Sequence, residues 1–344
     1  MRTSYVSTLS LLNTPRTGVQ RMQQDLVRLN KEVVTGRMAD VGLNLGAQTG
    51  RSVTLHIDTA SLASFAASNA SVMTRMDQSQ SALNALSAGA NDFLGQIIQA
   101  RGSSGSTIAG VAQSALAGFV SGANATDGEQ YLFGGINSGT PPINDPAAGK
   151  AAIDAAFLAK FGFTQDDPAA AGISAAQMSD FLDNEFSALF DDPGWGTTWS
   201  TASDQPLTNR ISPTETATTS VSANAPAMRK LAMVYSMVAD LGVDKLGADA
   251  RQALLDKAAN VAGGTIDGLT SLQAGLGTTQ ARIKDATDRL TVQQTILEQR
   301  IGTLEGVDPA EAKVKIDTLT TQIEMSYSLT AKLLQMSILN YVSP

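Results

Sequence analysis

The residues that could carry out chemistry are few and scattered. The single histidine, His56, has no cysteine near it, because the chain contains none. The absence of cysteine excludes disulfides, thiolate metal sites and a cysteine nucleophile. A lone histidine at the start of a predicted helix is far more often structural or solvated than a ligand or a catalyst. We therefore predict no catalytic residue, no metal site and no cofactor.

The remaining polar clusters do not match the spacing of a binding site. Asp166-Asp167 and Asp191-Asp192 are each followed by proline, which is typical of turns on an acidic surface. Neither pair has the spacing of a Ca²⁺-binding loop. The glycine cluster at 102–105 follows a predicted helix rather than a strand, so it does not resemble a phosphate-binding loop. These patterns indicate that the chain is not an enzyme.

Regular apolar spacing is the strongest pattern in the sequence. Residues seven apart return to nearly the same side of a helix, so such a run forms a narrow apolar seam suited to a partner helix. One seam lies near each end of the chain. The C-terminal seam is Leu269, Leu276, Ile283, Leu290, Leu297 and Leu304, and the N-terminal one is Leu12, Val19, Leu26 and Val33 with Met22 and Leu29 between them.

Length and charge narrow the class of protein further. At 344 residues the chain can form two or three domains and a sizeable core. The net charge of −8 argues against a nucleic-acid-binding protein, which needs a basic surface. The first 15 residues show no secretory signal. The uncharged run 102–126 is too rich in Ser, Gly, Ala and Gln for a membrane span.

An inserted segment differs in composition from the rest of the chain. Residues 138–220 hold 7 of the 11 prolines, both tryptophans, and 3 basic against 11 acidic residues, so they carry all the excess charge. No proline occurs from Arg16 to Thr140, and proline cannot continue a helix interior. We predict two helical arms that flank an acidic module, of mixed or β-rich structure, with its own small aromatic core.

Patterns of capping residues and breakers locate the individual elements. Asp308-Pro309-Ala310-Glu311 predicts a helix start, with Asp308 as the cap and Glu311 as its capping-box partner. Residues 131–135 read as a short strand or turn where the insert begins, and 208–222 as edge strand with Pro213 at a turn. The predicted helices span 12–34, 52–100, 107–126, a stretch from 226, 248–262, 269–306 and 309–341, with a loop at 42–50.

The predicted fold is mainly α: an elongated rod of long antiparallel helices with terminal coiled-coil arms and an inserted mixed, β-containing outer domain. We expect a terminal coiled-coil domain (1–40 and 305–344), a helical rod domain (41–137 and 221–304) and an outer domain (138–220). The candidate assembly residues are Leu12, Val19, Met22, Leu26, Leu29, Val33, Leu297, Leu304, Ile316, Leu319, Ile323, Leu333, Ile338 and Tyr341.

Four stretches of the chain resemble the bacterial flagellin superfamily, and within it most closely the hook-associated proteins of the hook–filament junction. The departure from the family is at 39–46, where many members carry an Asp-Asp-Pro-type turn. The resemblance covers both arms, about three quarters of the chain. Its stretches are the helix end Leu26–Arg37, the run Tyr131-Leu132-Phe133-Gly134-Gly135, the segment Ser220–Asn224 and the ending Ser337-Ile338-Leu339-Asn340-Tyr341-Val342.

The resemblance implies a structural adaptor that joins the flagellar hook to the flagellin filament. It implies secretion through the flagellar type III channel, a cytoplasmic export chaperone, and assembly as a homo-oligomer ring. The ring would lie between a neighbouring hook-associated protein and flagellin. Two alternatives stay open: a flagellin-like filament subunit, and a secreted coiled-coil effector unrelated to the flagellum.

Overall fold

The structure is a computed structural model of the chain, and it describes residues 8–101 and 107–342. For residues 8–15, 333–334 and 336–342 only the backbone is described. In chain order the helices and strands are α1 (Thr8–Thr35), α2 (Val41–Leu45), α3 (Thr49–Ala100), α4 (Ile108–Ala123), α5 (Pro146–Phe161), α6 (Ala175–Phe181), β1 (Thr208–Ser212), β2 (Glu215–Thr218), α7 (Pro226–Asp240), α8 (Ala248–Glu305) and α9 (Pro309–Val342).

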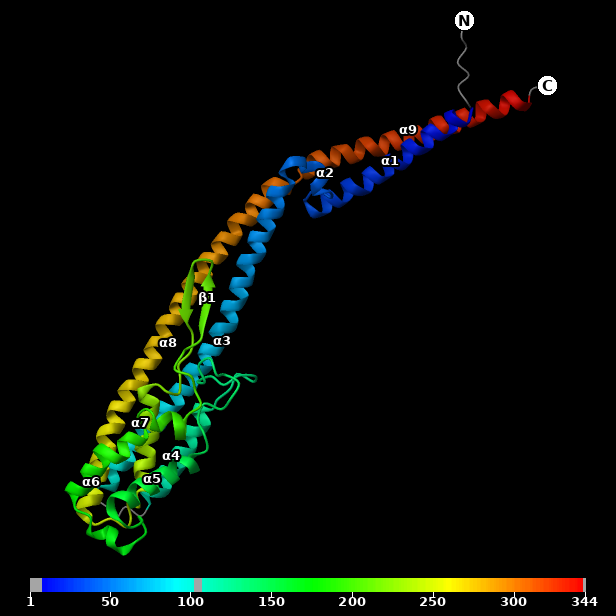
Figure 1. The fold of residues 1–344 in the computed structure, drawn as a ribbon. Coiled ribbons are helices and arrows are strands. Elements are labelled where there is room, and N and C mark those ends of the chain that lie inside the picture. Colours follow the sequence, from blue (N-terminus) through cyan, green and yellow to red (C-terminus); the bar gives the residue numbers. More distant parts are fainter. Residues whose placement is uncertain (1–7, 102–106, 343–344) are drawn as a thin grey trace. The chain divides into compact units, whose positions relative to one another are not determined.

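These elements form two compact units. Unit 1 consists of the residues up to Ala63 and from Thr291 onward, and unit 2 is Ser64–Leu290 (Figure 1). The two longest helices, α3 and α8, each contribute residues to both units. The predicted mainly α fold is confirmed, and β1 and β2 are the only strands in the described part of the chain.

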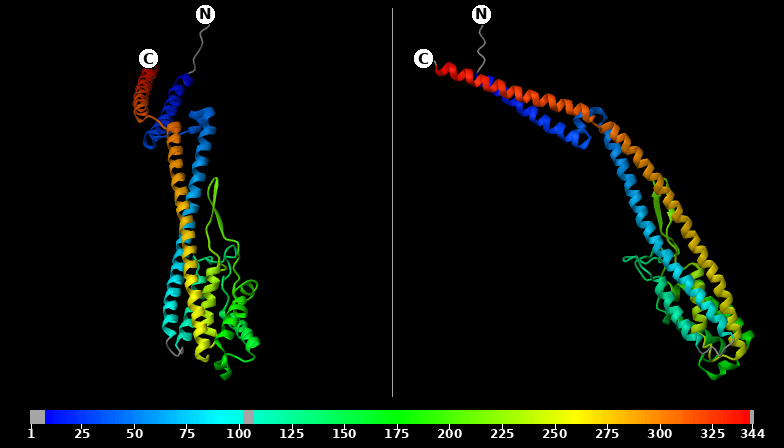
Figure 2. Two further views of the ribbon diagram at one scale, coloured as in Figure 1. Left: turned by 90° about the vertical axis from the view of Figure 1, so that its left-hand side faces the viewer. Right: turned by 180° about the vertical axis from the view of Figure 1, so that it is seen from behind.

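Unit 2 is built around four helices that bury their apolar faces together. Helices α4 and α7 pack against each other beside α3 and α8 (Figure 2). Tyr235 of α7 lies between Phe93 of α3 and Phe119 of α4, with ring centroids 5.1 and 6.4 Å apart. The part of the α8 seam that lies in this unit is buried along its whole length. Its residues are Leu269, Leu276, Ile283 and Leu290.

The insert 138–220 is more helical than expected. Helices α5 and α6 and several short turns of helix fill most of it, and strands occur only at its end. The prolines mislead because Pro146 and Pro168 begin helical turns, which Asp145 and Asp167 cap. The aromatic rings of the insert pack on one another, and this ring cluster is continuous with the apolar core of the four helices. The buried rings are Phe157, Phe181, Phe186, Phe190, Trp195 and Trp199.

The hairpin of β1 and β2 lies against α3 and α8 within unit 2. The strands pair antiparallel, with Thr208 opposite Thr218, and Pro213 lies in the turn between them as predicted. Asn69 Nδ2 of α3 donates to the Ile211 carbonyl at 2.9 Å. Glu215 pairs with Arg282 and Arg289 of α8 at 3.1 and 3.0 Å. The hairpin is therefore fixed to both long helices.

Two expected breaks are helical in the structure. Helix α8 continues through Gly263 and Gly264, where the sequence predicted separate helices, because neither glycine is pressed by a neighbour and a long helix tolerates them. The predicted loop at 42–50 contains the short helix α2 and a further helical turn, Gly46–Gln48. Asp40 caps α2 by accepting a hydrogen bond from Leu43 N.

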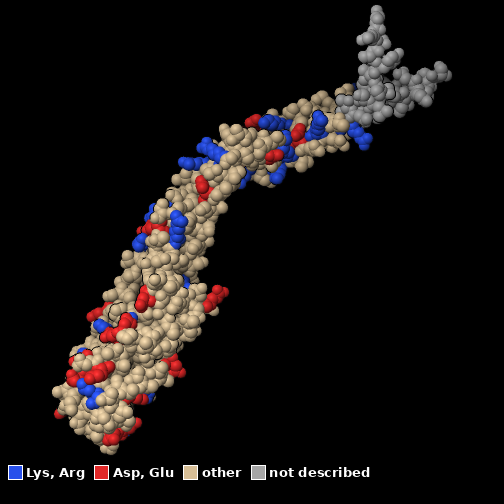
Figure 3. Space-filling view, viewed as in Figure 1, with Lys and Arg blue, Asp and Glu red and all other residues tan. Residues whose placement is uncertain are grey.

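Charge differs between the two units. In Figure 3, Lys and Arg side chains are spread over unit 1, whereas Asp and Glu side chains gather over unit 2. Counted over the sequence, unit 1 has 11 basic and 10 acidic residues and unit 2 has 13 and 22. In the described part of the chain, no helix combines the length and apolar character that a membrane crossing needs.

Candidate assembly surface

The N- and C-terminal helices pack against each other in unit 1 (Figures 1 and 2). Val19 and Leu29 of α1 are buried in this pair. The Gln23 side chain donates to the Tyr327 hydroxyl at 3.1 Å, while Gly36 and Val307 meet at the other end of the pair. The helices therefore run antiparallel, as residues at a seven-residue spacing permit.

The candidate assembly residues lie along this pair and the adjoining end of α8. Val19 and Leu29 are buried, and all the others with described side chains are half-buried. The side chains of Leu12, Leu333, Ile338 and Tyr341 lie outside the described residues. The half-buried group is Met22, Leu26, Val33, Leu297, Leu304, Ile316, Leu319 and Ile323.

A second apolar set on α1 and α9 is exposed to solvent. Val34 is 86% exposed and Val27 is 69% exposed. Large exposed apolar groups that gather on one element mark interaction sites. Sequence analysis did not single out the two exposed valines of α1, which stand next to Leu26 and Val33 in the chain. On α9 the exposed set is Val314, Met325, Tyr327 and Leu329.

A buried carboxylate at the end of α8 contacts α3 and the segment that follows α1. Glu305, the last residue of α8, has a side chain only 4% exposed. Its carboxylate accepts a hydrogen bond from Ser52 Oγ at 2.6 Å and lies 2.8 Å from His56 Nε2. Arg37 Nη2 lies 3.6 Å from the other carboxylate oxygen. We call these four residues the Glu305 cluster.

Electrostatics favour the ionised form of Glu305. Burial alone would raise the pKa of this carboxyl. The hydrogen bonds from Ser52 and His56, together with the positive charges of His56 and Arg37, outweigh burial and hold its pKa below the ordinary value. Sequence analysis assigned His56 a structural or solvated role and gave no sign of Glu305, which is 249 residues away.

Backbone hydrogen bonds reinforce the same joint. Met38 N donates to the Glu305 carbonyl at 2.8 Å, and Val307 N donates to the Gly36 carbonyl at 3.1 Å. Gly36 has a φ of +66°, which favours glycine, and a Cβ on Gly306 would lie 2.3 Å from the Gly302 carbonyl. The predicted cap of α9 is present, since Ala310 N bonds to Asp308, but Glu311 pairs with Lys315 instead.

The run Tyr131–Gly135 forms a turn in unit 2 rather than a strand. Leu132 and Phe133 are buried in the core. A Cβ on Gly134 would lie 2.8 Å from the Asn137 carbonyl, and one on Gly135 would lie 2.6 Å from the Gln205 carbonyl. Both glycines are therefore required by close approach of the backbone.

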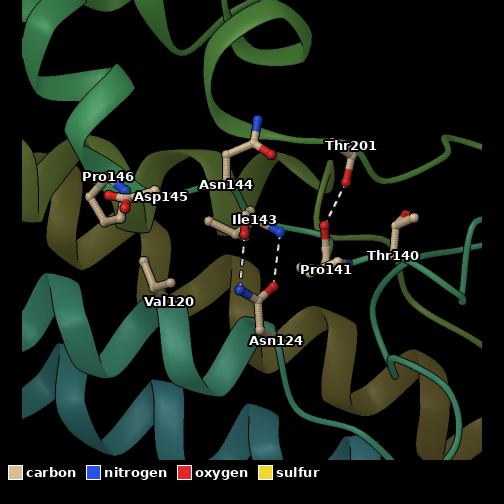
Figure 4. A pocket seen from close by; sticks show the side chains of 9 residues that line it. All are labelled: Val120, Asn124, Thr140, Pro141, Ile143, Asn144, Asp145, Pro146 and Thr201. Carbon is tan, nitrogen blue, oxygen red and sulfur yellow. Dashed lines mark hydrogen bonds between the residues drawn. The ribbon is translucent and has the colours of Figure 1, made fainter.

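A cleft of about 540 Å³ adjoins this turn, and its polar groups are already occupied (Figure 4). Asn124 exchanges two hydrogen bonds of 2.9 Å with the Ile143 backbone. Asp145 caps α5, and Asn144 donates to the Thr198 carbonyl. These polar side chains therefore bind protein atoms and hold the neighbouring segments together. No cluster of three potential metal ligands occurs among the described residues.

Comparison with known proteins places this geometry in a family. Residues 6–138 match the bacterial flagellin N-terminal helical region, and residues 259–342 match the bacterial flagellin C-terminal helical region. Together the two matches cover more than half of the chain. No curated protein sequence matches it.

A solved structure described as a flagellar hook-associated protein from Vibrio parahaemolyticus has a similar fold. The TM-score is 0.52 at 11% sequence identity, over 75% of this chain and 97% of that chain. The likeness extends the evidence from two terminal regions to the fold. The two flagellin regions and this similar fold indicate that the protein is a structural, non-enzymatic subunit of the flagellum. The chain belongs to the bacterial flagellin family.

Proposed function

We propose that this chain is the structural adaptor that joins the flagellar hook to the flagellin filament. The observation that carries a self-assembling role is the α1–α9 pair, which buries one apolar face internally and leaves a second exposed. Two further points favour the junction: the Tyr131–Gly135 turn resembles that of junction proteins, and the similar solved fold is described as a hook-associated protein.

Assembly follows from the cost of leaving that second face in water. Burying a large aliphatic side chain is worth about 1.5–3 kcal/mol, so several such residues per subunit drive association with neighbours. The division expected from the sequence fits this role: residues 1–40 and 305–344 assemble, 41–137 and 221–304 form the helical body, and 138–220 faces outward. The acidic insert keeps the assembly soluble.

The partners of this role are other flagellar proteins. The chain forms a homo-oligomer ring, with a neighbouring hook-associated protein on one side and flagellin on the other. An export chaperone covers the exposed apolar helices in the cytoplasm before secretion through the flagellar type III channel. The candidate assembly residues then form contacts between copies.

A deletion strain distinguishes the proposed role from a filament-forming flagellin. Loss of a junction adaptor leaves hooks without filaments and releases flagellin into the medium. Electron microscopy of the cells and immunoblots of the medium measure both. Hook-attached filaments in the deletion strain would contradict the adaptor role. Secretion that continues without the flagellar export apparatus would favour the unrelated effector.

A point variant tests the candidate assembly residues of the seam. Leu26→Asp places a charge in the half-buried seam, where an unpaired charge costs several kcal/mol, and we expect filament attachment to be lost. Leu158→Asp is the matched control, because Leu158 is 47% exposed on α5 of unit 2. Secretion and circular dichroism should be unchanged in both variants. Normal attachment with Leu26→Asp would refute the assignment of this seam to assembly.

A further inference from the structure

A projecting loop of unit 2, residues 127–140, combines an apolar side chain with acidic ones. Part of the loop stands out from the helices of unit 2 in two views, while Leu132 and Phe133 hold its middle in the core (Figures 1 and 2). Ile136 is 53% exposed. Asp127 and Glu129 are the only charged residues of the loop, so it carries two negative charges and no positive one.

Bonds within the loop and to neighbouring segments hold it in one shape. Tyr131 N donates to the Ser138 carbonyl at 2.8 Å, which ties its two limbs together. Ile136 N donates to the Gln205 carbonyl at 3.1 Å. Arg75 of α3 pairs with Asp127 at 3.2 Å, whereas the Glu129 carboxylate has no charged partner among the described residues. The loop therefore presents a fixed apolar residue beside an unpaired carboxylate.

A groove in unit 1 has the complementary character. It has a volume of about 400 Å³ and lies between the start of α3 and the end of α8. Leu55 is buried at its base, and Ile296 is 44% exposed. Arg51 and Arg300 line it, and within the described ranges neither guanidinium meets a carboxylate. The groove is lined by two positive charges and no negative one; its other lining residues are Gln299, Thr303 and Leu304.

We propose that the 127–140 loop of one copy docks in the Arg51–Arg300 groove of a second copy. Ile136 would contact the exposed Ile296, and Glu129 would face the unpaired arginines. Charges of opposite sign at the rim of an apolar contact favour the correct partner and raise the association rate. The contact deepens the proposed function, because it rests on self-assembly of the chain.

The loop and the groove are different surfaces of the chain. A copy whose loop is docked can therefore offer its own groove to a third copy. Contacts of this kind generate closed rings or open helical assemblies rather than isolated dimers. The proposal thus assigns to the Tyr131–Gly135 turn a role that its buried residues alone do not explain: it positions the docking loop.

Disulfide trapping tests the contact on purified full-length protein, because the natural chain has no cysteine. Gly139→Cys places a thiol on the loop, at an exposed glycine with no atom within 4 Å of its Cβ position. Thr303→Cys places one in the groove. Only two different copies can link when the two single variants are mixed. Gly172→Cys mixed with Thr303→Cys is the control, since Gly172 is equally open.

We expect the Gly139–Thr303 mixture to form mixed disulfides on the order of tenfold faster than the control. The chain with both substitutions should form a ladder of linked oligomers. Equal rates for the two mixtures, at all concentrations up to the solubility limit, would overturn the proposal. A double variant that stops at closed dimers would overturn the head-to-tail arrangement.

Charge reversal adds a second readout. Glu129→Lys on the loop chain, or Arg300→Glu on the groove chain, should lower the trapping rate about tenfold, and combining them should restore it. Failure of restoration would refute this ion pairing. The proposed junction role is judged separately, by filaments in the deletion strain. That role can fail while trapping succeeds, and the reverse.

Discussion

The two ends of helix α8 carry the same seven-residue apolar spacing in different surroundings. In unit 2, Leu290 is 2% exposed beneath neighbouring helices, whereas in unit 1 the next seam residue, Leu297, is only half-buried. The spacing thus specifies an apolar face, and the number of neighbouring elements decides how far that face is buried. Unit 2 completes its core within one chain, whereas unit 1 leaves part of its apolar surface exposed.

Truncation of an apolar side chain should give the largest difference in stability loss between the two units. We expect Phe93→Ala in unit 2 to lower the free energy of unfolding by about 3–5 kcal/mol, because it leaves a cavity beside Tyr235. Leu297→Ala in unit 1 should cost only about 1 kcal/mol. Urea denaturation of the purified chain measures both. Equal losses would show that the two regions are buried alike in the single copy.

Added volume provides the next test. A Cβ on Gly149 of α5 would lie 2.2 Å from the Trp199 ring, so Gly149→Ala should cost about 1–3 kcal/mol by overpacking. Gly18 of α1 has no atom within 4 Å of its Cβ position. Gly18→Ala should therefore stabilise unit 1 by about 0.5–1 kcal/mol through helix propensity. Thermal unfolding compares them, and a neutral Gly149→Ala would mean that the insert is loosely packed.

The Glu305 cluster gives unit 1 a distinct response to acid. A carboxyl whose pKa is lowered by folding stabilises the folded state above its ordinary pKa, here 4.5, and loses that contribution as the pH falls below it. Glu305→Gln should cost about 1–2 kcal/mol at pH 7 by removing charged hydrogen bonds. Hydrogen exchange at 36–40 and 306–308 should report it. The variant and the natural chain should converge as the pH falls from 4.5 through the lowered pKa of Glu305, and a gap that persisted in stronger acid would contradict this origin.

Asp240 of unit 2 should show the opposite pH dependence. Burial is the main cause that raises its pKa from 3.8 to about 6, and the negative charge of Asp154 adds to this effect against the opposing charge of Lys150. Ionising it therefore destabilises the folded state as the pH rises from about 4 to 6. Asp240→Asn should raise stability by on the order of 1 kcal/mol at pH 7 and leave it unchanged at pH 4. If Asp240→Asn instead lowered stability at pH 7, the negative charge of Asp240 would be stabilising the folded state.

The sequence predicted the long helices well and the contacts between distant residues poorly. Seam spacing located α1, α3 and α9 to within about four residues, because periodicity is a local property. It split α8 at Gly263 and Gly264, since glycine reads as a break even where a long helix passes through it. The Glu305 cluster could not be found, because its members are ordinary polar residues brought together only by folding.

The insert shows a second limit of sequence analysis. Its prolines and aromatic residues indicated a change of structure at 138–220, and Pro213 correctly marked the hairpin turn. They did not reveal short helices, because Asp145 and Asp167 cap them next to the very prolines that suggested non-helical structure. Proline at the first helical position favours a helix rather than ending it.

The antiparallel course of α1 and α9 has a practical consequence for imaging. Because the pair meets its linkers at Gly36 and Val307, the Thr8 end of α1 and the Val342 end of α9 point the same way within unit 1. A fluorescent protein fused at either terminus would crowd the same stretch of helix. A dye coupled at Gly172 avoids this conflict and would let labelled copies be followed into the growing appendage.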